Sequence, residues 1–251
     1  MPAETDTQPR VLVVIPAWNE EATIAATIAD LRSAQPTFDF LVVDDGSSDA
    51  TAEVADAAGA AVCRLPFNLG VGGAMRAGYR YGLRHDYDVV AQLDADGQHD
   101  PAYLTEMIAG LAGADIVIGA RFAGAGDYQV GLMRGSAMRL LAGTLSRLAG
   151  TRLTDTTSGF RVVNRRALAV FAAHYPAEYL GDTVESLVIA LRTGCTVTQI
   201  PVVMRPRAGG TASQTPFKAA IYLARAVVAL GLALVRRWPT TLEPKALEAA
   251  A

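Results

Sequence analysis

Cysteine, net charge and a hydrophobic leader are scarce or absent in this 251-residue chain. The two cysteines, Cys63 and Cys195, lie far apart among apolar residues, which excludes a cysteine metal site and predicts two small core residues in a reducing compartment. A net charge of −3 gives no indication of nucleic-acid binding. Residues 1–10 contain no apolar segment, so we expect no signal peptide and a site facing the cytoplasm.

An apolar run long enough to cross a membrane is also missing. The stretch 219–235 has about seventeen residues, against the roughly 20 that a spanning helix needs, and Arg225 interrupts it. Arg236 and Arg237 follow directly, which favours a helix lying in the membrane interface with its arginines near lipid headgroups. The alternative is a core helix with one snorkelling arginine.

What the chain does contain is a regular alternation of strand and helix patterns. Hydrophobic residues make up 51% of the sequence and charged residues 19%, which is typical of a folded protein. Apolar, β-branched runs predict strands at 11–15, 40–43, 61–63, 88–93 and 115–119. Apolar residues at helical spacing predict helices at 23–31, 49–58, 71–83 and 104–111. This alternation predicts an α/β domain with a mostly parallel, twisted sheet flanked by helices.

The alternation ends in a glycine-rich loop at 119–135. A helix of about fifteen residues containing Met138 to Leu148 and a late strand within 193–204 are expected after it. No internal repeat or linker divides the sequence, so we expect one domain. The predicted boundaries are a disordered N-terminus at 1–9, the domain at 10–215, an interfacial helix at 216–238 and a flexible tail at 239–251.

Polar residues follow four of the predicted strands. In open α/β sheets, ligands bind beyond the carboxyl ends of the strands, so these segments should meet at one rim. Carboxylates crowded at a rim repel one another unless a cation or hydrogen-bond donors compensate. The segments are 16–20, 44–47, 68–73 and 94–99.

Asp94 and Asp96 are the strongest candidates for a cation site, because they directly follow a buried strand. Two carboxylates can hold a divalent ion and leave positions for diphosphate oxygens, and Gln98 could add a carbonyl oxygen. His99 is expected to be a hydrogen-bonding partner, since the other ligands are hard oxygens. The alternative for a lone acidic pair is a solvated loop.

The other rim segments suggest a nucleotide. The alternative for 44–49 is a turn plus a helix cap, a role that suits Ser47 to Asp49. Two successive carboxylates before the cap exceed what capping needs, so Asp45 could accept hydrogen bonds from a base or ribose. Trp18 could line the base pocket or pack in the core. The glycines of 68–73 follow the third strand rather than the first, which disfavours a dinucleotide-binding dehydrogenase.

Taken together, these motifs resemble the family 2 glycosyltransferases, and within them the polyprenyl-phosphate (dolichol-phosphate) mannose or glucose synthases. The resemblance implies the GT-A fold and covers about residues 10 to 215. The matching segments are Val14-Ile-Pro-Ala-Trp-Asn-Glu20, Val42-Val-Asp-Asp-Gly-Ser-Ser-Asp49, Gln92-Leu-Asp-Ala-Asp-Gly-Gln-His99, Gly119-Ala-Arg-Phe122, Thr157-Ser-Gly-Phe-Arg161 and Arg207-Ala-Gly-Gly210.

The resemblance also implies roles for individual residues. Those expected to hold the nucleoside are Pro16, Trp18, Glu20, Val43 and Asp45. Those expected at the diphosphate and its Mg²⁺ or Mn²⁺ are Asp94, Ala95, Asp96 and Gln98. The arginines expected to bind donor or acceptor phosphates are Arg121, Arg134 and Arg207. Asp155 occupies the acidic position near the transferred sugar. The chain departs from many members at 179–185 and at Ser213, both on the acceptor side.

The implied activity is inverting, metal-assisted transfer of a hexose from a nucleotide sugar of the GDP-mannose or UDP-glucose type to a polyprenyl phosphate. The expected location is the cytoplasmic membrane face, by peripheral contact, or the cytoplasm; a homo-oligomer is left open. A hydroxyl acceptor would instead need a base, for which Asp155, Asp182 and Glu185 are candidates. A non-catalytic nucleotide-sugar-binding subunit is a further alternative. A nucleotidyltransferase is disfavoured, because no glycine-rich basic loop follows the first strand.

Overall fold

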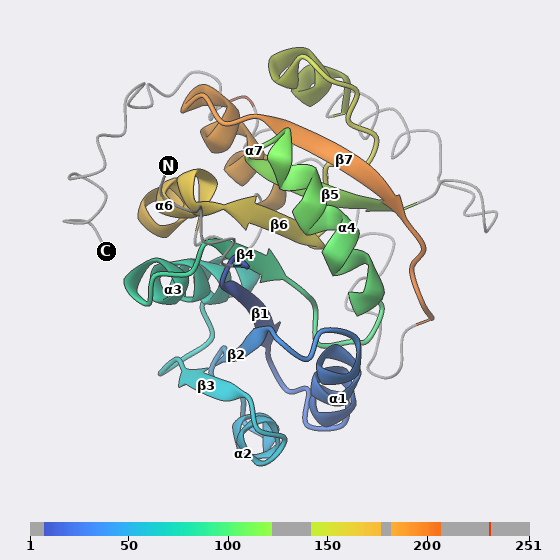
Figure 1. Ribbon diagram of the computed structural model, residues 1–251. Helices are drawn as coiled ribbons and strands as arrows, with labels where there is room; N and C mark the ends of the chain where they lie inside the picture. The colour runs from blue at the N-terminus through green and yellow to red at the C-terminus, as the bar shows by residue number, and fades with distance from the viewer. Residues whose placement is uncertain (1–7, 122–141, 177–181, 207–230, 232–251) are drawn as a thin grey trace, which may run out of the picture.

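The computed structural model describes residues 8–121, 142–176, 182–206 and 231. Within these ranges, one seven-stranded sheet lies between helices on both of its faces (Figure 1). The strands are β1 (Val11–Ala17), β2 (Asp39–Asp44), β3 (Ala61–Arg64), β4 (Val89–Gln92), β5 (Ile116–Arg121), β6 (Arg161–Asn164) and β7 (Val197–Val202). The helices are α1 (Ile24–Ala34), α2 (Thr51–Ala57), α3 (Val71–Arg84), α4 (Leu104–Ala109), α6 (Arg165–His174) and α7 (Asp182–Arg192), with short 3₁₀ turns at Pro101–Tyr103 and Gly110–Ala112. Residues 142–149 are also helical.

The strand order is β3-β2-β1-β4-β6-β5-β7. Six strands run in the same direction, and β6 is antiparallel to both of its neighbours, β4 and β5. The predicted mostly parallel sheet is therefore confirmed. Because β6 runs in the opposite direction, its first residue, Arg161, lies at the rim where β4 and β5 end.

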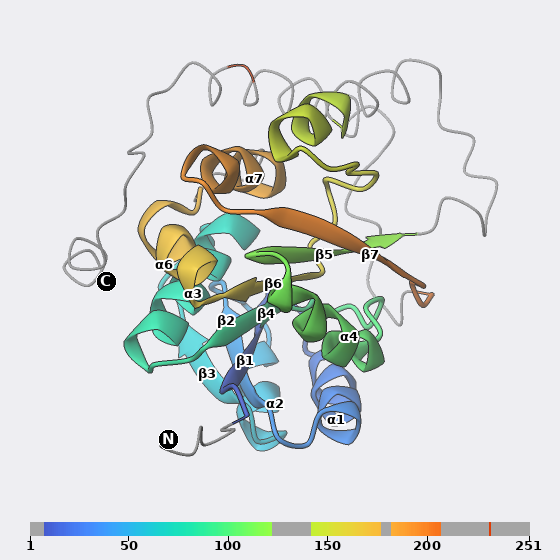
Figure 2. The same ribbon diagram turned by 45° about the horizontal axis from the view of Figure 1, so that its top comes forward.

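Two hydrophobic cores form on the two faces of the sheet because successive strand residues point to opposite sides. From β1, Leu12 and Val14 pack with α3, α6 and α7, whereas Val13 and Ile15 pack with α1 and α4. Figure 2 shows the two helical layers on either side of the strands. The burial of β1 from both sides explains its continuous apolar run.

Two details of the sequence prediction need correction. Cys195 is buried as predicted, but Cys63 is only partly buried, because it lies on the short strand β3 at the edge of the sheet. The helix expected to be capped by Ser48 or Asp49 begins at Thr51, after Ala50, and the backbone N–H of Thr51 donates to the Asp49 carboxylate. The predicted late strand is present as β7.

The predicted ends of the chain fall largely outside the described residues. Segments 1–7 and 239–251 lie outside them, as does the expected interfacial helix at 216–238 except for position 231. The boundaries at 215 and 238 therefore stay predictions. Among the helices in the described ranges, none has the length and hydropathy of a membrane-spanning segment. The described part of the domain, from β1 to β7, contains the strands that border the acidic rim.

Candidate active site

The ends of β1 and β2 are joined by hydrogen bonds from Asn19. Its backbone N–H donates to Ser47 Oγ at 2.9 Å, and its Oδ1 accepts the Ser48 N–H at 2.9 Å. Asn19 has a φ of 54°, which asparagine tolerates better than most residues. A third hydrogen bond joins the same two segments: the N–H of Glu20 donates to Thr51 Oγ1 at 2.8 Å. The two loops thus form one rigid border of the rim.

Asp45 holds the glycine-rich loop after β3. Its Oδ1 accepts the Leu69 N–H at 2.7 Å and its Oδ2 accepts the Gly70 N–H at 2.8 Å. Burial raises the pKa of this carboxyl, against the two hydrogen bonds, and the neighbouring charge of Asp44 raises it further. Each oxygen of Asp45 therefore has a backbone partner, which gives Asp45 a structural role; its contact with the nucleoside stays a prediction.

Gly46 lets the glycine-rich loop lie close to the end of β2. Its φ is +71°, and a Cβ at this position would lie 2.7 Å from the carbonyl carbon of Phe67. Phe67 is 63% exposed and Trp18, after β1, is 55% exposed. The structure therefore excludes core packing for Trp18. It also adds an exposed aromatic residue, Phe67, that the sequence interpretation missed.

The remaining residues predicted to hold the nucleoside lie deeper. Pro16 is buried in β1, opposite Val43 of β2, and Val43 is completely buried in the core. Glu20 is partly buried and its Oε2 accepts a hydrogen bond from Thr23 Oγ1 at 2.7 Å. The side chain of Val43 thus supports the sheet beneath the rim, while Trp18 and Glu20 lie closer to its surface.

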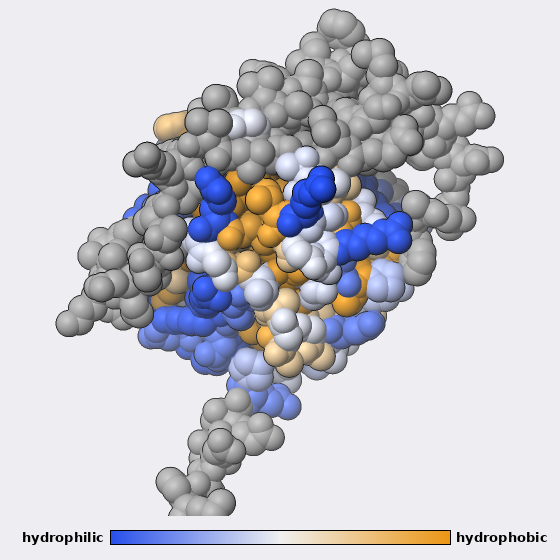
Figure 3. All heavy atoms as spheres, turned by 90° about the horizontal axis from the view of Figure 1, so that it is seen from above, coloured by the Kyte–Doolittle hydropathy of each residue, from blue (hydrophilic) through white to orange (hydrophobic). Residues whose placement is uncertain are grey.

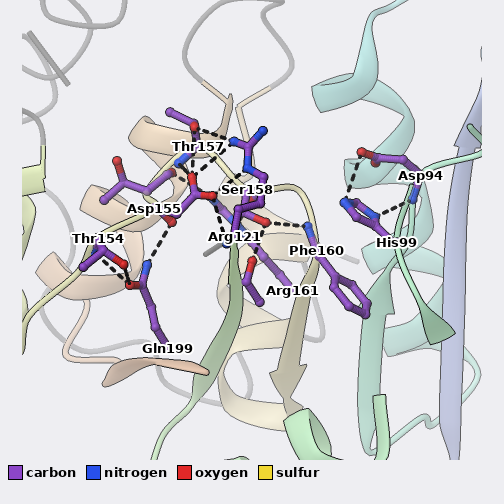
Figure 4. Close-up of polar contacts among 12 residues, drawn as sticks. Asp94, His99, Arg121, Thr154, Asp155, Thr157, Ser158, Phe160, Arg161 and Gln199 are labelled. Carbon is purple, nitrogen blue, oxygen red and sulfur yellow. Dashed lines mark hydrogen bonds and ion pairs between the residues drawn. The ribbon is translucent and has the colours of Figure 1, made fainter. Parts of the chain in front are cut away.

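Asp94 and His99 form the centre of the rim (Figure 4). The Asp94 N–H donates to His99 Nδ1 at 3.1 Å, which places the proton of a neutral ring on Nε2, 3.7 Å from Asp94 Oδ2. The buried His99 ring stacks on Phe160, with centroids 4.8 Å apart. Gln92 Nε2 lies 3.4 Å from Asp94 Oδ1. His99 is thus a hydrogen-bonding partner, as predicted.

The turn after Asp94 folds back on itself. Asp96 is buried, and its Oδ1 accepts the Gln98 N–H at 3.0 Å. Ala95 is buried, and its carbonyl accepts a hydrogen bond from Thr27 Oγ1 of α1 at 3.0 Å. These bonds fix the turn that carries the predicted cation ligands against α1.

The donor set of this turn fits a hard divalent cation. The Asp94 side chain is 40% exposed, and a Cβ at Gly159 would lie 3.3 Å from each of its carboxylate oxygens, so the glycine leaves room beside them. In the described ranges, no three His, Cys, Asp or Glu side chains form a metal-binding cluster. Asp94 and Asp96 would thus hold Mg²⁺ or Mn²⁺ only together with other oxygens, such as those of a diphosphate.

Arg121 and Asp155 form an ion pair on the other side of the rim (Figure 4). Arg121 Nε donates to Asp155 Oδ2 at 2.8 Å, and its Nη2 lies 3.3 Å from Oδ1 and from Thr157 Oγ1. Burial alone would raise the pKa of Asp155, but the hydrogen bonds and charge of Arg121 lower it. The same bonds, and the charge of Asp94, raise the pKa of Arg121.

The segment that carries Asp155 is fixed from β7 and from β6. Gln199 accepts the Thr154 N–H at 2.7 Å and donates to the Asp155 carbonyl at 2.8 Å. Arg161 is fully buried and donates to the carbonyls of Thr156 and Ser158 at 3.1 and 2.8 Å. Neither contact was predicted: the Gln199 contacts join residues that only the strand order brings together, and the local contacts of Arg161 depend on the burial of its guanidinium.

Arg161 also connects this segment to α7. It donates to the Thr183 carbonyl at 3.1 Å and to Ser186 Oγ at 3.0 Å. Of the other base candidates, Asp182 begins α7 and Glu185 lies one turn further on. The predicted phosphate-binding Arg134 and Arg207 lie outside the described residues.

A cavity of about 370 Å³ lies at the opposite end of the sheet, where β2 and β3 begin. Its polar groups pair with neighbours: Tyr87 donates to Asp39 at 2.9 Å, and Arg32 donates to the Gly59 carbonyl at 3.1 Å. Burial and the contact with Asp39 raise the pKa of Tyr87 to about 12. The candidate site is the acidic rim, because ligands of open α/β sheets bind at the carboxyl ends of the strands.

Solved structures with the same fold identify the class of the domain. The crystal structure of glucosyl-3-phosphoglycerate synthase from Mycobacterium tuberculosis with Mn²⁺, UDP and glucosyl-3-phosphoglycerate superposes with a TM-score of 0.69 at 21% sequence identity. The match covers 90% of this chain and 80% of that chain. The likeness shows that the domain has the GT-A type of fold.

The chain belongs to glycosyl transferase family 2: residues 12–171, more than half of the sequence, match the profile of that family. It is 35% identical over 201 residues to the undecaprenyl-phosphate mannosyltransferase of Micrococcus luteus, covering 77% of this chain and 82% of the relative. It is 31% identical over 223 residues to the polyprenol monophosphomannose synthase of Mycolicibacterium smegmatis, covering 85% and 84%. The chain is therefore a glycosyltransferase, as the motifs predicted.

Proposed function

We propose that this enzyme transfers a mannosyl group, with inversion, from a nucleotide sugar to a polyprenyl phosphate. The observation that carries the proposal is the Arg121–Asp155 ion pair, because Arg121 occupies and neutralises the carboxylate that is expected beside the sugar. A general base needs a pKa near the working pH, whereas the pKa of Asp155 is lowered. Asp155 is thus better suited to orient Arg121 than to accept a proton.

An acceptor that is already an anion removes the need for a base. A phosphate monoester has a second pKa near about 6 and is largely ionised at pH 7. Its oxygen can attack the anomeric carbon directly, and a single in-line attack inverts that carbon. Among the described residues, Asp155 and Thr157 accept hydrogen bonds from Nε and Nη2 of Arg121, so the Nη1 donors of its guanidinium are proposed to bind a phosphate. The names of the two relatives support a polyprenyl phosphate as this acceptor.

Asp94 and Asp96 are proposed to hold a divalent cation beside the donor diphosphate, with Gln98 completing the ligands. A bound cation would neutralise charge that develops on the leaving nucleoside diphosphate. Crystal structures of glucosyl-3-phosphoglycerate synthase hold Mn²⁺ or Mg²⁺ together with UDP, which supports this part of the proposal. Trp18 and Phe67 are the exposed aromatic residues at the proposed nucleoside end.

A lipid acceptor requires the site to work at a membrane surface. Figure 3 views the side of the molecule where α7, β7 and the helix at 142–149 lie, and shows apolar surface bordered by hydrophilic side chains. Such a surface fits peripheral contact with lipid. The predicted interfacial helix at 216–238 would add to this contact, at the cytoplasmic membrane face.

The test is a transfer assay with labelled GDP-mannose or UDP-glucose, and with polyprenyl phosphate, 3-phosphoglycerate or a simple glycoside as acceptor. We expect labelled lipid from a polyprenyl phosphate, dependent on Mn²⁺ or Mg²⁺. Asp96→Ala should lower the rate more than about tenfold, as expected for the loss of a metal ligand. Asp88→Asn is the matched control, because Asp88 lies before β4, at the far end of the same strand.

Each acceptor leads to a different conclusion. Transfer only to 3-phosphoglycerate would replace the lipid by a soluble anionic acceptor. Transfer to the glycoside would contradict the base-free chemistry. Unchanged transfer and metal dependence in Asp96→Ala would contradict the cation site. Thermal shifts with each donor, with and without Mn²⁺, identify the nucleotide independently of turnover.

A further inference from the structure

Arg205 connects the chain beyond β7 to the turn that carries the proposed cation ligands. Its backbone N–H donates to the Gln98 carbonyl at 2.9 Å. The N–H of Gln98 in turn donates to Asp96 Oδ1 at 3.0 Å. A single residue, Gln98, therefore separates the Arg205 contact from the carboxylate of Asp96.

The guanidinium of Arg205 joins two further elements. Nη1 donates to Asp30 Oδ2 of α1, and Nη2 lies 2.8 Å from Asp100 Oδ1. Asp100 follows the turn and accepts the Ala102 N–H at 3.0 Å, at the start of the 3₁₀ turn Pro101–Tyr103. Arg205 thus fixes both the middle of the turn, at Gln98, and its end, at Asp100, to α1.

We propose that Arg205 is a positioning residue for the divalent cation, holding the 96–100 turn in the arrangement in which Asp96 and Gln98 can bind it. The proposal rests on the cation site of the proposed function. Arg205 acts through the turn and has no role as a ligand. A planar guanidinium can contact two carboxylates at once from separate nitrogens, which the single ammonium of lysine does less well.

The effect should appear in cation affinity rather than in the chemical step. Residues that orient metal ligands typically contribute about 10- to 100-fold to metal affinity. The Arg205 side chain is 41% exposed and its backbone bond to Gln98 survives substitution, so we expect the lower end, about tenfold. Once the cation is saturating, kcat should stay within about threefold of the wild type, since the ligands themselves are intact.

The experiment measures equilibrium binding of Mn²⁺ to the full chain with nucleoside diphosphate, by electron paramagnetic resonance of free Mn²⁺, and in parallel the Mn²⁺ dependence of transfer. The variants are Arg205→Ala, Arg205→Lys and Asp30→Asn. Arg165→Ala is the matched control: Arg165 is 45% exposed and its guanidinium likewise makes two contacts, to the Asp86 carboxylate and the Tyr87 carbonyl, but at the other end of β4.

We expect Mn²⁺ affinity to fall about tenfold in Arg205→Ala, less in Arg205→Lys, and not at all in Arg165→Ala. Asp30→Asn should weaken binding in the wild type but add nothing in the Arg205→Ala background, because both changes remove the same contact. Equal affinities in the wild type, Arg205→Ala and Asp30→Asn would overturn the role of Arg205 alone. Absence of Mn²⁺ binding in the wild type would overturn the cation site, and the role of Arg205 with it. Asp30→Asn keeps the test decisive should Arg205→Ala fold poorly.

Discussion

Replacing Gly159 by alanine tests whether the segment before β6 packs against the carboxylate of Asp94. A Cβ at Gly159 would lie 2.9 Å from Gln92 Nε2 and 3.3 Å from both Asp94 oxygens. Ordinary contacts begin at 3.4 Å, so Gln92 must move by about 0.5 Å and Asp94 by a smaller amount. The φ of Gly159 lies outside the left-handed region, so alanine adds no backbone strain.

The expected cost follows from this displacement. A misplacement of about 1 Å can reduce a rate about 100-fold. Gln92 Nε2 donates to Asp94 Oδ1, so we expect the Asp94 carboxylate to follow the half-ångström shift of Gln92, which predicts roughly a tenfold loss, equivalent to about 1.4 kcal/mol in the barrier. The loss should appear in kcat/KM for the donor and as a higher KM for Mn²⁺. Overpacking costs about 1 kcal/mol at its low end, which lowers Tm by about 2–4 °C in a chain of this size.

Two glycine variants provide the controls. Gly113→Ala adds a methyl group with nothing within 4 Å and should leave both activity and Tm unchanged. Gly82→Ala places a Cβ 2.7 Å from Val90 Cγ2, inside the core, and should lower Tm without a specific effect on the KM for Mn²⁺. Kinetic constants of Gly159→Ala within about twofold of those of Gly113→Ala would refute the packing of Gly159 against Asp94, since that packing predicts roughly a tenfold loss.

Two further predictions concern Asp155 and Arg161. Because the folded-state pKa of Asp155 is lowered from an unfolded value near about 3.9, its pairing with Arg121 stabilises the fold fully above that pH and is lost as the pH falls through the folded-state pKa. Asp155→Asn should therefore destabilise the protein at pH 7 and make its stability depend less on pH in the acid range, measured by thermal unfolding from about pH 3 to 7. The pH profile of kcat/KM for the acceptor should still fall below about pH 6, because that fall comes from protonation of the acceptor phosphate. Arg161→Met should leave three buried carbonyls without their donor, at about 1 kcal/mol each, and lower Tm by about 6–12 °C; a change under about 2 °C would contradict the role of its hydrogen bonds.

The first half of the fold was predictable because its signals are local. The strands β1 to β5 and the helices α1 to α4 all occur where apolar runs and helical spacing indicated them. The strand β6 was missed because it has four residues and begins with a buried arginine. The helix α6 was missed although Leu168 and Phe171, three residues apart, are both buried on its inner face.

The candidate site was predictable to the extent that its residues follow strands. Asp94, Asp96 and Asp45 were found because they come directly after apolar runs. Gln199 and Arg205 carry no local signal, since their contacts join residues 44 or more positions apart. The ion pair between Arg121 and Asp155, which changes the expected chemistry of both residues, depends likewise on the placement of β6 beside β5.

The reversed direction of β6 has a consequence for how enzymes of this design can diversify. The connection from β5 to β6 leaves the sheet at Arg121 and returns through Asp155 to Arg161, so it starts and finishes at the same rim. The Arg121–Asp155 pair closes the base of this connection. Insertions or deletions between the two residues can therefore occur while both anchoring points, and the strands β1 to β4 that carry the proposed nucleotide site, keep their positions.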